Sequence, residues 1–262
     1  IYSGSSWSSI VGGSGNTIQQ FANYSFIGGG TGNTIWHRYN AIVGGQDNTI
    51  FSDAVYDPAV VKDSWMSFIG AGRLNQIAGK QDFIGSGREN QIMSGTARSS
   101  IVGGYRNIIR SGKPYSTVSN FIGGGTENTI DYNNSASVIV GGGTNIIYGD
   151  IEQSNMSSYG FIGSGFNNQI SGFTTTIVAG QNNQAFTRFA FVGGGSGNEI
   201  WQNADNSTIV GGQFNVIHGH PTVTAKTAEG IFFSVSGYSI YSFIGGGYSN
   251  EISGSTNVIV GG

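Results

Sequence analysis

The acidic residues of the chain are the first candidates for catalysis. Hydrolysis of a glycosidic bond needs two carboxyl groups about 5–10 Å apart, one of them with a raised pKa. The 14 acidic residues are scattered, and Asp53, Asp57 and Asp63 form the densest group, within one short stretch. Charged side chains in such stretches are mostly solvated. We therefore interpret the three as loop charges and predict that the protein is not an enzyme.

Two histidines are the candidates for metal binding. His218 and His220 are two residues apart, so their side chains point to the same side of an extended segment. Three copies around a symmetry axis would gather six imidazole nitrogens, which suit several transition metals. No carboxylates accompany the pair and the chain has no Cys, so we interpret it as a solvated loop pair. The sequence predicts no metal site and no cofactor.

The composition excludes several partners. Only 10% of the 262 residues are charged, the net charge is −3, and no basic cluster is present, so nucleic acid is not expected as a partner. No apolar run is long enough for a membrane helix, and Ile1 to Ser9 lack the layout of a signal peptide. The chain stops within a copy of the repeat described next, so we expect it to be a segment of a longer protein.

The many Gly-Gly pairs belong to a repeat and not to nucleotide-binding loops. Each copy has two apolar residues, a glycine-rich turn and an asparagine. One form reads Ile42-Val43-Gly44-Gly45-Gln46-Asp47-Asn48, and the other, Phe26-Ile27-Gly28-Gly29-Gly30-Thr31-Gly32-Asn33, has one residue more before its Asn. The 14 copies begin at Ile10, Phe26, Ile42, Phe68, Phe83, Ile101, Phe121, Ile139, Phe161, Ile177, Phe191, Ile209, Phe243 and Ile259.

Each copy is predicted to form a strand, a turn and a second strand, because β-formers alternate with Gly and Asn and no helical period appears. The extra Gly of the Phe copies is expected in a bulge or a longer turn. The second strand, as in Asn33-Thr34-Ile35, should have one wet face. The first strand is apolar at both adjacent positions, so both of its faces should be buried. Stacked asparagines could form a hydrogen-bonded ladder.

These patterns predict an all-β fold, a repetitive β-solenoid or β-roll that occupies residues 1–262 as one domain. We favour one copy per coil over two, because the neighbouring Phe copies at Phe68 and Phe83 would put a two-copy coil out of step. Insertions are expected at 51–67, 110–120, 148–160 and 218–242.

The coil can cover only one face of the first strand, so the other face needs a partner. For so regular a repeat the economical partner is an identical chain, and an uncovered stripe would be an unusually large apolar patch. We predict a parallel homotrimer. Its interface would comprise the second apolar residue of each copy: Val11, Ile27, Val43, Ile69, Ile84, Val102, Ile122, Val140, Ile162, Val178, Val192, Val210, Ile244 and Val260.

Copies such as Ser8-Ser9-Ile10-Val11-Gly12-Gly13 and Ser242-Phe243-Ile244-Gly245-Gly246-Gly247 resemble the head repeats of trimeric autotransporter adhesins. They resemble even more the repeats of related fibre proteins of tailed phages, cyanophages among them. The resemblance implies a left-handed β-roll, three parallel chains, and attachment to a host from an extracellular or virion surface.

The resulting prediction is a structural and adhesive fibre protein, the shaft or head of a phage tail fibre. A bacterial cell-surface adhesin is the alternative within this class. A polysaccharide-cleaving tailspike is the alternative from another class. An ice- or mineral-binding solenoid would need a regular threonine array, which Gln and Glu interrupt.

Loops on a rigid scaffold commonly carry recognition, and aromatic residues are frequent in binding hot spots. A cell-surface polysaccharide or protein receptor is the expected partner. The competing interpretation is that segment 218–242 folds as a hairpin over its own aromatic residues, and that Trp36 and Trp201 pack at coil edges. The receptor-binding candidates are Trp65, Tyr115, Tyr159, Phe232, Phe233, Tyr238 and Tyr241.

Overall fold

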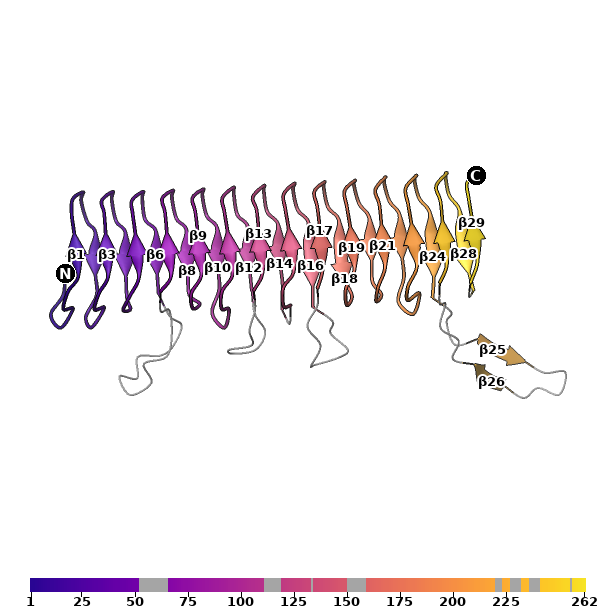
Figure 1. Cartoon of the computed structure of the whole chain (residues 1–262), viewed down its shortest axis with the longest axis horizontal. Coiled ribbons are helices and arrows are strands. Elements are labelled where there is room, and N and C mark those ends of the chain that lie inside the picture. Colours follow the sequence, from indigo (N-terminus) through magenta and orange to yellow (C-terminus); the bar gives the residue numbers. More distant parts are fainter. Residues whose placement is uncertain are drawn as a thin grey trace. The chain divides into compact units, whose positions relative to one another are not determined.

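The fold is all-β, as predicted. The computed structural model describes residues 1–51, 66–110, 119–132, 134–149, 159–219, 223–226, 232–235, 241–254 and 256–262, and these residues contain strands and turns but no helix. The chain divides into two compact units, Ile1–Thr144 and Asn145–Gly262. Both units contain the same type of coil, and the chain is a parallel β-solenoid of about 12 turns with two strands per coil (Figure 1).

Each coil holds one first strand and one second strand. In the unit Ile1–Thr144 the first strands are β1 (Ser9–Ile10), β3 (Phe26–Ile27), β5 (Ala41–Ile42), β7 (Phe68–Ile69), β9 (Phe83–Ile84), β11 (Ser100–Ile101), β13 (Phe121–Ile122) and β15 (Val138–Ile139). The second strands are β2 (Thr17–Ile18), β4 (Thr34–Ile35), β6 (Thr49–Ile50), β8 (Gln76–Ile77), β10 (Gln91–Ile92), β12 (Ile108–Ile109) and β14 (Thr129–Ile130).

The unit Asn145–Gly262 repeats this plan. Its first strands are β17 (Phe161–Ile162), β19 (Thr176–Ile177), β21 (Phe191–Val192), β23 (Thr208–Ile209), β27 (Phe243–Ile244) and β29 (Val258–Ile259). Its second strands are β16 (Ile146–Tyr148), β18 (Gln169–Ser171), β20 (Gln184–Ala185), β22 (Glu199–Ile200), β24 (Val216–His218) and β28 (Glu251–Ser253).

Within each unit every first strand pairs in parallel with the first strand of the next coil, and the second strands do the same. For example, β3 pairs with β5 through Phe26↔Ala41 and Ile27↔Ile42, and β4 pairs with β6 through Thr34↔Thr49 and Ile35↔Ile50. Consecutive copies therefore occupy consecutive coils. The prediction of one copy per coil is confirmed.

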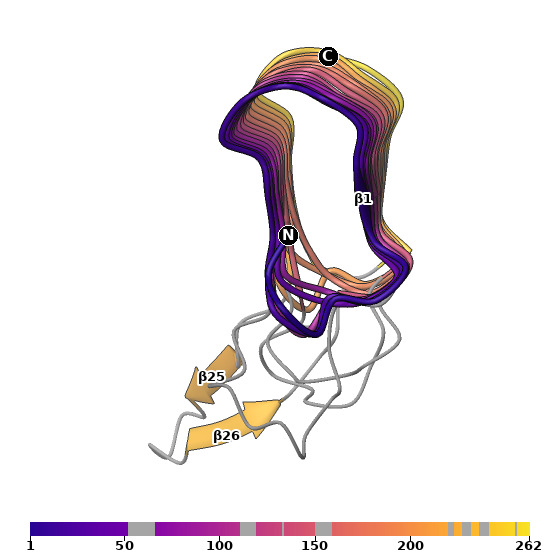
Figure 2. The same cartoon turned by 90° about the vertical axis from the view of Figure 1, so that its left-hand side faces the viewer.

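The core consists of two columns of buried residues, mostly isoleucine, that run through successive coils. Each coil contributes one residue from its first strand and one from its second. Ile42 of β5 and Ile50 of β6 have no exposed surface, and the equivalent residues of neighbouring coils are as fully buried. Figure 2 shows the coils end-on, with β1 on one of their two long sides. The residue before each second-strand isoleucine, such as Thr49 or Gln76, is partly exposed on the outer face. The second strand thus has the one wet face that was predicted.

The insertion at 218–242 contains a β-hairpin. Strands β25 (Val223–Lys226) and β26 (Phe232–Val235) pair antiparallel, with Val223 opposite Val235. The strand pairing expected for a hairpin in this segment is therefore present. The burial of its aromatic side chains lies outside what the structure describes.

Candidate functional site

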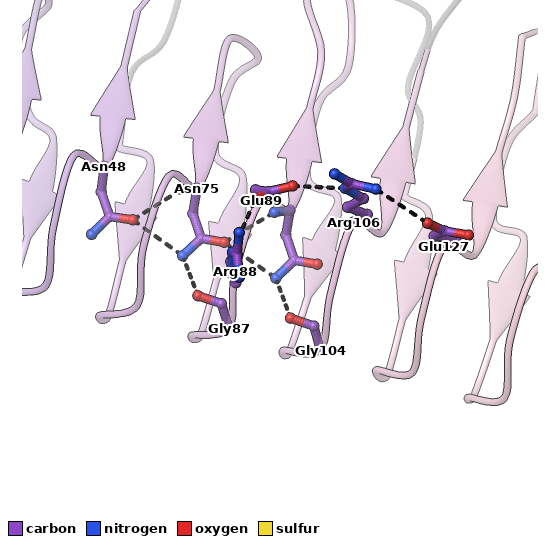
Figure 3. A network of polar contacts seen from close by, with 9 residues as sticks. Asn48, Asn75, Gly87, Arg88, Glu89, Gly104, Arg106 and Glu127 are labelled. Atoms are coloured by element: carbon purple, nitrogen blue, oxygen red, sulfur yellow. Dashed lines mark hydrogen bonds and ion pairs between the residues drawn. The ribbon is translucent and has the colours of Figure 1, made fainter.

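The turn between the two strands is held by a buried asparagine ladder. Asn75 is fully buried, and its Nδ2 donates to Asn48 Oδ1 of the preceding coil at 3.1 Å, to the carbonyl of Ala71 and to the carbonyl of Gly87. Figure 3 shows Asn75 with Asn48 and Gly87. Asn90 repeats this pattern one coil further on. The predicted ladder is confirmed in both units: Asn16, Asn33, Asn48, Asn75, Asn90, Asn107 and Asn128 form one, and Asn145, Asn168, Asn183, Asn198, Asn215 and Asn250 form the other.

The ladder fixes how the two forms of the repeat align. Six positions separate Ile42 from Asn48 in an Ile copy, and six separate Ile27 from Asn33 in a Phe copy. Ile27 and Ile42 are direct partners across the two coils. The extra residue of the Phe copies therefore precedes the common core. The predicted bulge or longer turn is therefore not found in the Phe copies as far as the structure describes them.

This alignment corrects half of the predicted interface. The second apolar residue of every Phe copy points into its own coil and has no exposed surface, so it cannot meet a partner chain. These residues are Ile27, Ile69, Ile84, Ile122, Ile162, Val192 and Ile244. The second residue of every Ile copy lies one position after the core isoleucine and therefore on the outer face. Those residues are Val11, Val43, Val102, Val140, Val178, Val210 and Val260, and all are exposed.

In the Phe copies, the phenylalanine that precedes the buried residue lies on the outer face. Phe26 precedes the buried Ile27 and is 39% exposed, and Phe121 precedes the buried Ile122 and is 36% exposed. We call the Phe of each Phe copy and the Val of each Ile copy on this face the Phe/Val ridge; Phe68 and Phe243 are partly exposed and the other members are exposed. In the first unit the ridge consists of Val11, Phe26, Val43, Phe68, Phe83, Val102, Phe121 and Val140, and in the second of Phe161, Val178, Phe191, Val210, Phe243 and Val260.

Each coil contributes one Phe or one Val to the ridge, and Val138 and Val258 add a second valine to the outer face of two coils. Where the first strand starts with Phe, the residue after the core isoleucine is Gly: a methyl group on Gly28 would lie 2.4 Å from the carbonyl oxygen of Val43 and 3.3 Å from Cε1 of Phe26. The Phe ring thus covers the position that has no side chain. Where that position holds Val, as at Val43, the first strand starts with a smaller residue such as Ala41. All seven Phe copies have the Gly, and all seven Ile copies have the Val.

A charged row lies on the exposed turn beside the asparagine ladder of the first unit. Glu89 accepts from Arg88 Nε at 2.8 Å and from Arg106 Nε at 2.7 Å, and Arg106 lies 3.5 Å from Glu127 (Figure 3). The hydrogen bond from Arg106 lowers the pKa of Glu89 below its usual value, and Arg88 adds to the effect. Because these side chains are solvated, the row contributes little to stability. It carries both signs of charge.

Sequence reasoning missed a buried carboxyl group, that of Asp82. It accepts a hydrogen bond from the Ser99 amide at 2.8 Å and one from Thr96 Oγ1 at 2.8 Å. Burial raises the pKa of Asp82 to about 7, although these two hydrogen bonds oppose the rise. Equivalent positions in other coils indicate a structural role, in which the side chain accepts a hydrogen bond from the backbone of the next coil. The residue before the first strand is buried and polar in successive coils: Ser25, Asn40, Ser67, Asp82, Ser99, Asn120 and Ser137.

The raised pKa of Asp82 predicts that the protein loses stability as the pH rises. Its pKa is about 3.8 in the unfolded chain and about 7 in the folded one. Between these values the folded state holds a proton that the unfolded state has lost, so the free energy of unfolding falls from about pH 4 to about pH 7. The full difference is at most about 4 kcal/mol at 1.36 kcal/mol per pKa unit.

Asp82→Asn is the test, with urea unfolding from pH 4 to pH 9. Asn120 already places an amide at this position in another coil, and its Oδ1 accepts from the Ser137 amide at 2.9 Å. We expect the variant to match the parent near pH 4 and to be more stable at pH 8. A parent whose stability rises between pH 4 and pH 7 through this residue would contradict the assignment.

The other predicted sites are only partly described. His218 pairs with Glu251 at 3.3 Å and lies beside the ring of Trp201, while His220 lies outside the described residues. Tyr159 and Tyr241 are exposed, and Tyr159 meets Phe173 edge-on. The backbones of Phe232 and Phe233 belong to β26, whereas the side chains of these two are not described. Asp53, Asp57, Asp63, Trp65, Tyr115 and Tyr238 lie outside the described residues.

Within the described ranges, no three His, Cys, Asp or Glu side chains come close enough to hold a metal ion. The same ranges contain no helix that could cross a membrane. No protein-family model matches the chain, and a search of curated proteins also found no match. On the fold alone, the chain is a parallel β-solenoid repeat protein.

Proposed function

We propose that this chain is a non-enzymatic fibre protein whose identical copies associate in parallel along the Phe/Val ridge. The observation that carries the proposal is the pairing of outer residues, Phe with Gly and a smaller residue with Val, in all 14 copies. Within each unit it gives every coil at least one Phe or Val on the outer face of the first-strand sheet. A face in contact with water alone has no need for such regularity, whereas a face packed against a regular partner does.

The apolar area of the ridge supports the proposal that another molecule covers it. From Phe26 to Val210, every ridge residue except Phe68 has 36% to 50% of its surface open. With about 200 Å² for a Phe side chain, this is roughly 70 Å² per coil and roughly 500 Å² for the first unit. An apolar patch of this size is at the upper end for a soluble monomer, and such patches commonly mark interaction sites.

An identical chain is the economical partner. Neighbouring strands are about 4.8 Å apart, and a second copy has the same spacing along its own ridge without any further design. Closed symmetry covers every ridge and leaves none exposed. We propose a parallel homotrimer, in line with the resemblance of the repeat to autotransporter heads and phage fibres.

The proposed role is the shaft or head of an attachment fibre on a virion or in the extracellular space. Stacked coils whose backbones pair with their neighbours resist local opening, and three chains held together present three copies of each surface loop. Weak contacts then gain from effective concentration. A bacterial cell-surface adhesin uses the same physics and is the second candidate, with a cell-surface polysaccharide or protein as receptor.

A single cysteine on the ridge tests this proposal, because the chain has no cysteine of its own. In a parallel, in-register assembly the same residue of each chain meets near the axis. We expect Val102→Cys to form a covalent dimer under mild oxidation or with a short bismaleimide. Thr129→Cys, on the outer face of the second-strand sheet, is the matched control and should stay monomeric in denaturing electrophoresis. Equal crosslinking of the two variants, or none of Val102→Cys, would overturn the proposal.

The enzymatic alternative has its own assay. Incubation with host capsule or exopolysaccharide would release new reducing ends if the chain were a glycosidase. We expect no release. Release that disappears in Asp53→Asn, Asp57→Asn or Asp63→Asn would replace the fibre proposal with a polysaccharide-cleaving one.

A further inference from the structure

We propose that a row of rings on the second-strand sheet of the unit Asn145–Gly262 binds a polysaccharide that lacks acidic groups. The row consists of Phe186, Trp201 and His218. The inference rests on the proposed attachment role and names a receptor class and the residues that contact it.

The three rings occupy the same position in consecutive coils. Phe186 and Trp201 directly follow the last, buried residue of their second strands. His218 is the last residue of β24 and follows the buried Ile217. All three side chains therefore project from the outer face. The ring centroids of Phe186 and Trp201 are 6.1 Å apart, and those of Trp201 and His218 are 6.3 Å apart. Trp201 is 42% exposed and the His218 side chain is 39% exposed. Trp201 meets Phe186 edge-on and is stacked with His218, so the three rings form one continuous strip on the outer face.

The backbone that carries the strip is held by pairing with the next coil. The amide of Phe186 donates to the Ile200 carbonyl at 2.8 Å, and the amide of Trp201 donates to the Ile217 carbonyl at 2.9 Å. His218 is further held by Glu251 at 3.3 Å. Ring positions set by strand pairing lose little conformational entropy on binding, which favours affinity.

Hydrogen-bonding groups flank the strip. Gln184 and Glu199 lie two residues before Phe186 and Trp201 on the same outer face and are partly exposed. The exposed Glu251 comes from the next coil, and its Oε1 lies 3.3 Å from Nε2 of His218. A carboxylate accepts hydrogen bonds from hydroxyl groups, and an amide both donates and accepts. Aromatic rings beside such groups match the two sides of a pyranose, apolar C–H faces and polar hydroxyls. The two carboxylates would repel an acidic sugar, which leaves neutral or amine-bearing polymers.

The dimensions favour a polymer over a small molecule or a protein. Small ligands take concave pockets, whereas these side chains stand on the outer face of a sheet. Three side chains cover far less than the roughly 800 Å² per partner of a typical protein interface. The three ring centroids follow one another at 6.1 and 6.3 Å, so a linear polymer can run along the row and contact the rings in turn.

The test is calorimetric titration of the full chain with neutral or amine-bearing β-linked oligosaccharides of glucose, mannose, xylose, glucosamine and N-acetylglucosamine, one to six units long, and with alginate. We expect at least one of these series to bind, with affinity that rises up to three units and then levels off. Trp201→Ala should weaken that binding at least tenfold. Phe214→Ala removes an aromatic residue of similar exposure, 52%, from another part of the same unit and should change it less than twofold.

Three outcomes overturn the inference: no binding to any of these series, preference for alginate, or equal effects of the two alanine variants. Binding of a host protein that depends on Trp201 without any sugar binding would also overturn it. The mass of each variant in solution separates this inference from the proposed function. Lost sugar binding with an intact trimer refutes only the sugar site, and a monomer that still binds sugar refutes only the self-association.

Discussion

Gly45→Ala is expected to unfold the coils around it, whereas Gly44→Ala is expected to be tolerated. Gly45 has a φ of 93°, which L residues rarely adopt. A methyl group on it would lie 2.1 Å from the carbonyl oxygen of Gly72 in the next coil. That oxygen already accepts from the amide of Gln46 at 2.8 Å and from Asn48 Nδ2 at 3.0 Å, so it cannot move away freely. We expect a loss of at least about 4 kcal/mol, in the range of severe substitutions.

Gly44 is the matched control because it is the neighbouring residue of the same turn. A methyl group on Gly44 would meet nothing within 4 Å, and its φ is not in the left-handed region. Gly44→Ala should therefore change stability by less than about 1 kcal/mol. The measurement is chemical unfolding followed by circular dichroism. If both variants lose the same stability, the close approach of successive backbones at this turn is not as described.

Asn90→Ala should cause the second large loss of stability. The Nδ2 of Asn90 donates to Asn75 Oδ1, to the Ser86 carbonyl and to the Gly104 carbonyl at 3.0 to 3.2 Å. Its Oδ1 accepts from the amide and from Nδ2 of Asn107, at 3.0 and 3.1 Å. Alanine leaves these buried groups without their partner, and each orphaned group costs about 1–3 kcal/mol. We expect a total loss of about 5 kcal/mol.

Gln91→Ala separates the ladder from the general effect of a shorter side chain. Gln91 is the next residue, and it lies partly exposed on the outer face of β10. Its replacement should change stability by no more than about 0.5 kcal/mol. Urea unfolding of both variants is the measurement, with hydrogen exchange of the Asn107 amide as a local readout. If the ladder does not stabilise the fold, the two variants will have equal urea midpoints and the Asn107 amide will keep its protection from exchange.

The fold was predictable because every copy of the repeat has the same order of apolar residues, glycines and asparagine. The recurrence of Asn-x-Ile fixes the inner and outer faces of the second strand, as Thr49 and Ile50 show. The break at Phe68 and Phe83 correctly favoured one copy per coil. The stacked asparagines follow from the same reasoning, because equivalent residues of successive coils must meet at the same corner.

The orientation of the first strand was predicted only in part. Strands of two residues have no internal period, so the copies were aligned by their apolar heads, and Ile27 was placed on the outer face with Val43. Counting back six residues from each asparagine would have aligned Ile27 with Ile42 and moved Phe26 outward. The apolar outer face was expected, whereas its phenylalanines and their paired glycines were not.

The sequence also contained a signal for Asp82. Acidic residues are mostly solvated, so an isolated aspartate such as Asp82 does not stand out as a buried residue. Its column of Ser25, Asn40 and Ser67 shows that the residue before each first strand is polar and faces inward. The ring row at Trp201 was interpreted as edge packing, because sequence spacing alone does not show that Phe186 and His218 lie on either side of it.

Sedimentation equilibrium of the unmodified chain tests most directly whether identical copies cover the Phe/Val ridge. The account predicts, at micromolar concentration, a single species of three times the 27.4 kDa of one chain. It also predicts that Phe121→Asp lowers this mass, because a carboxylate then faces the apolar contact, while Thr129→Asp leaves it unchanged. A mass of 27.4 kDa for the unmodified chain over the whole concentration range would contradict the account.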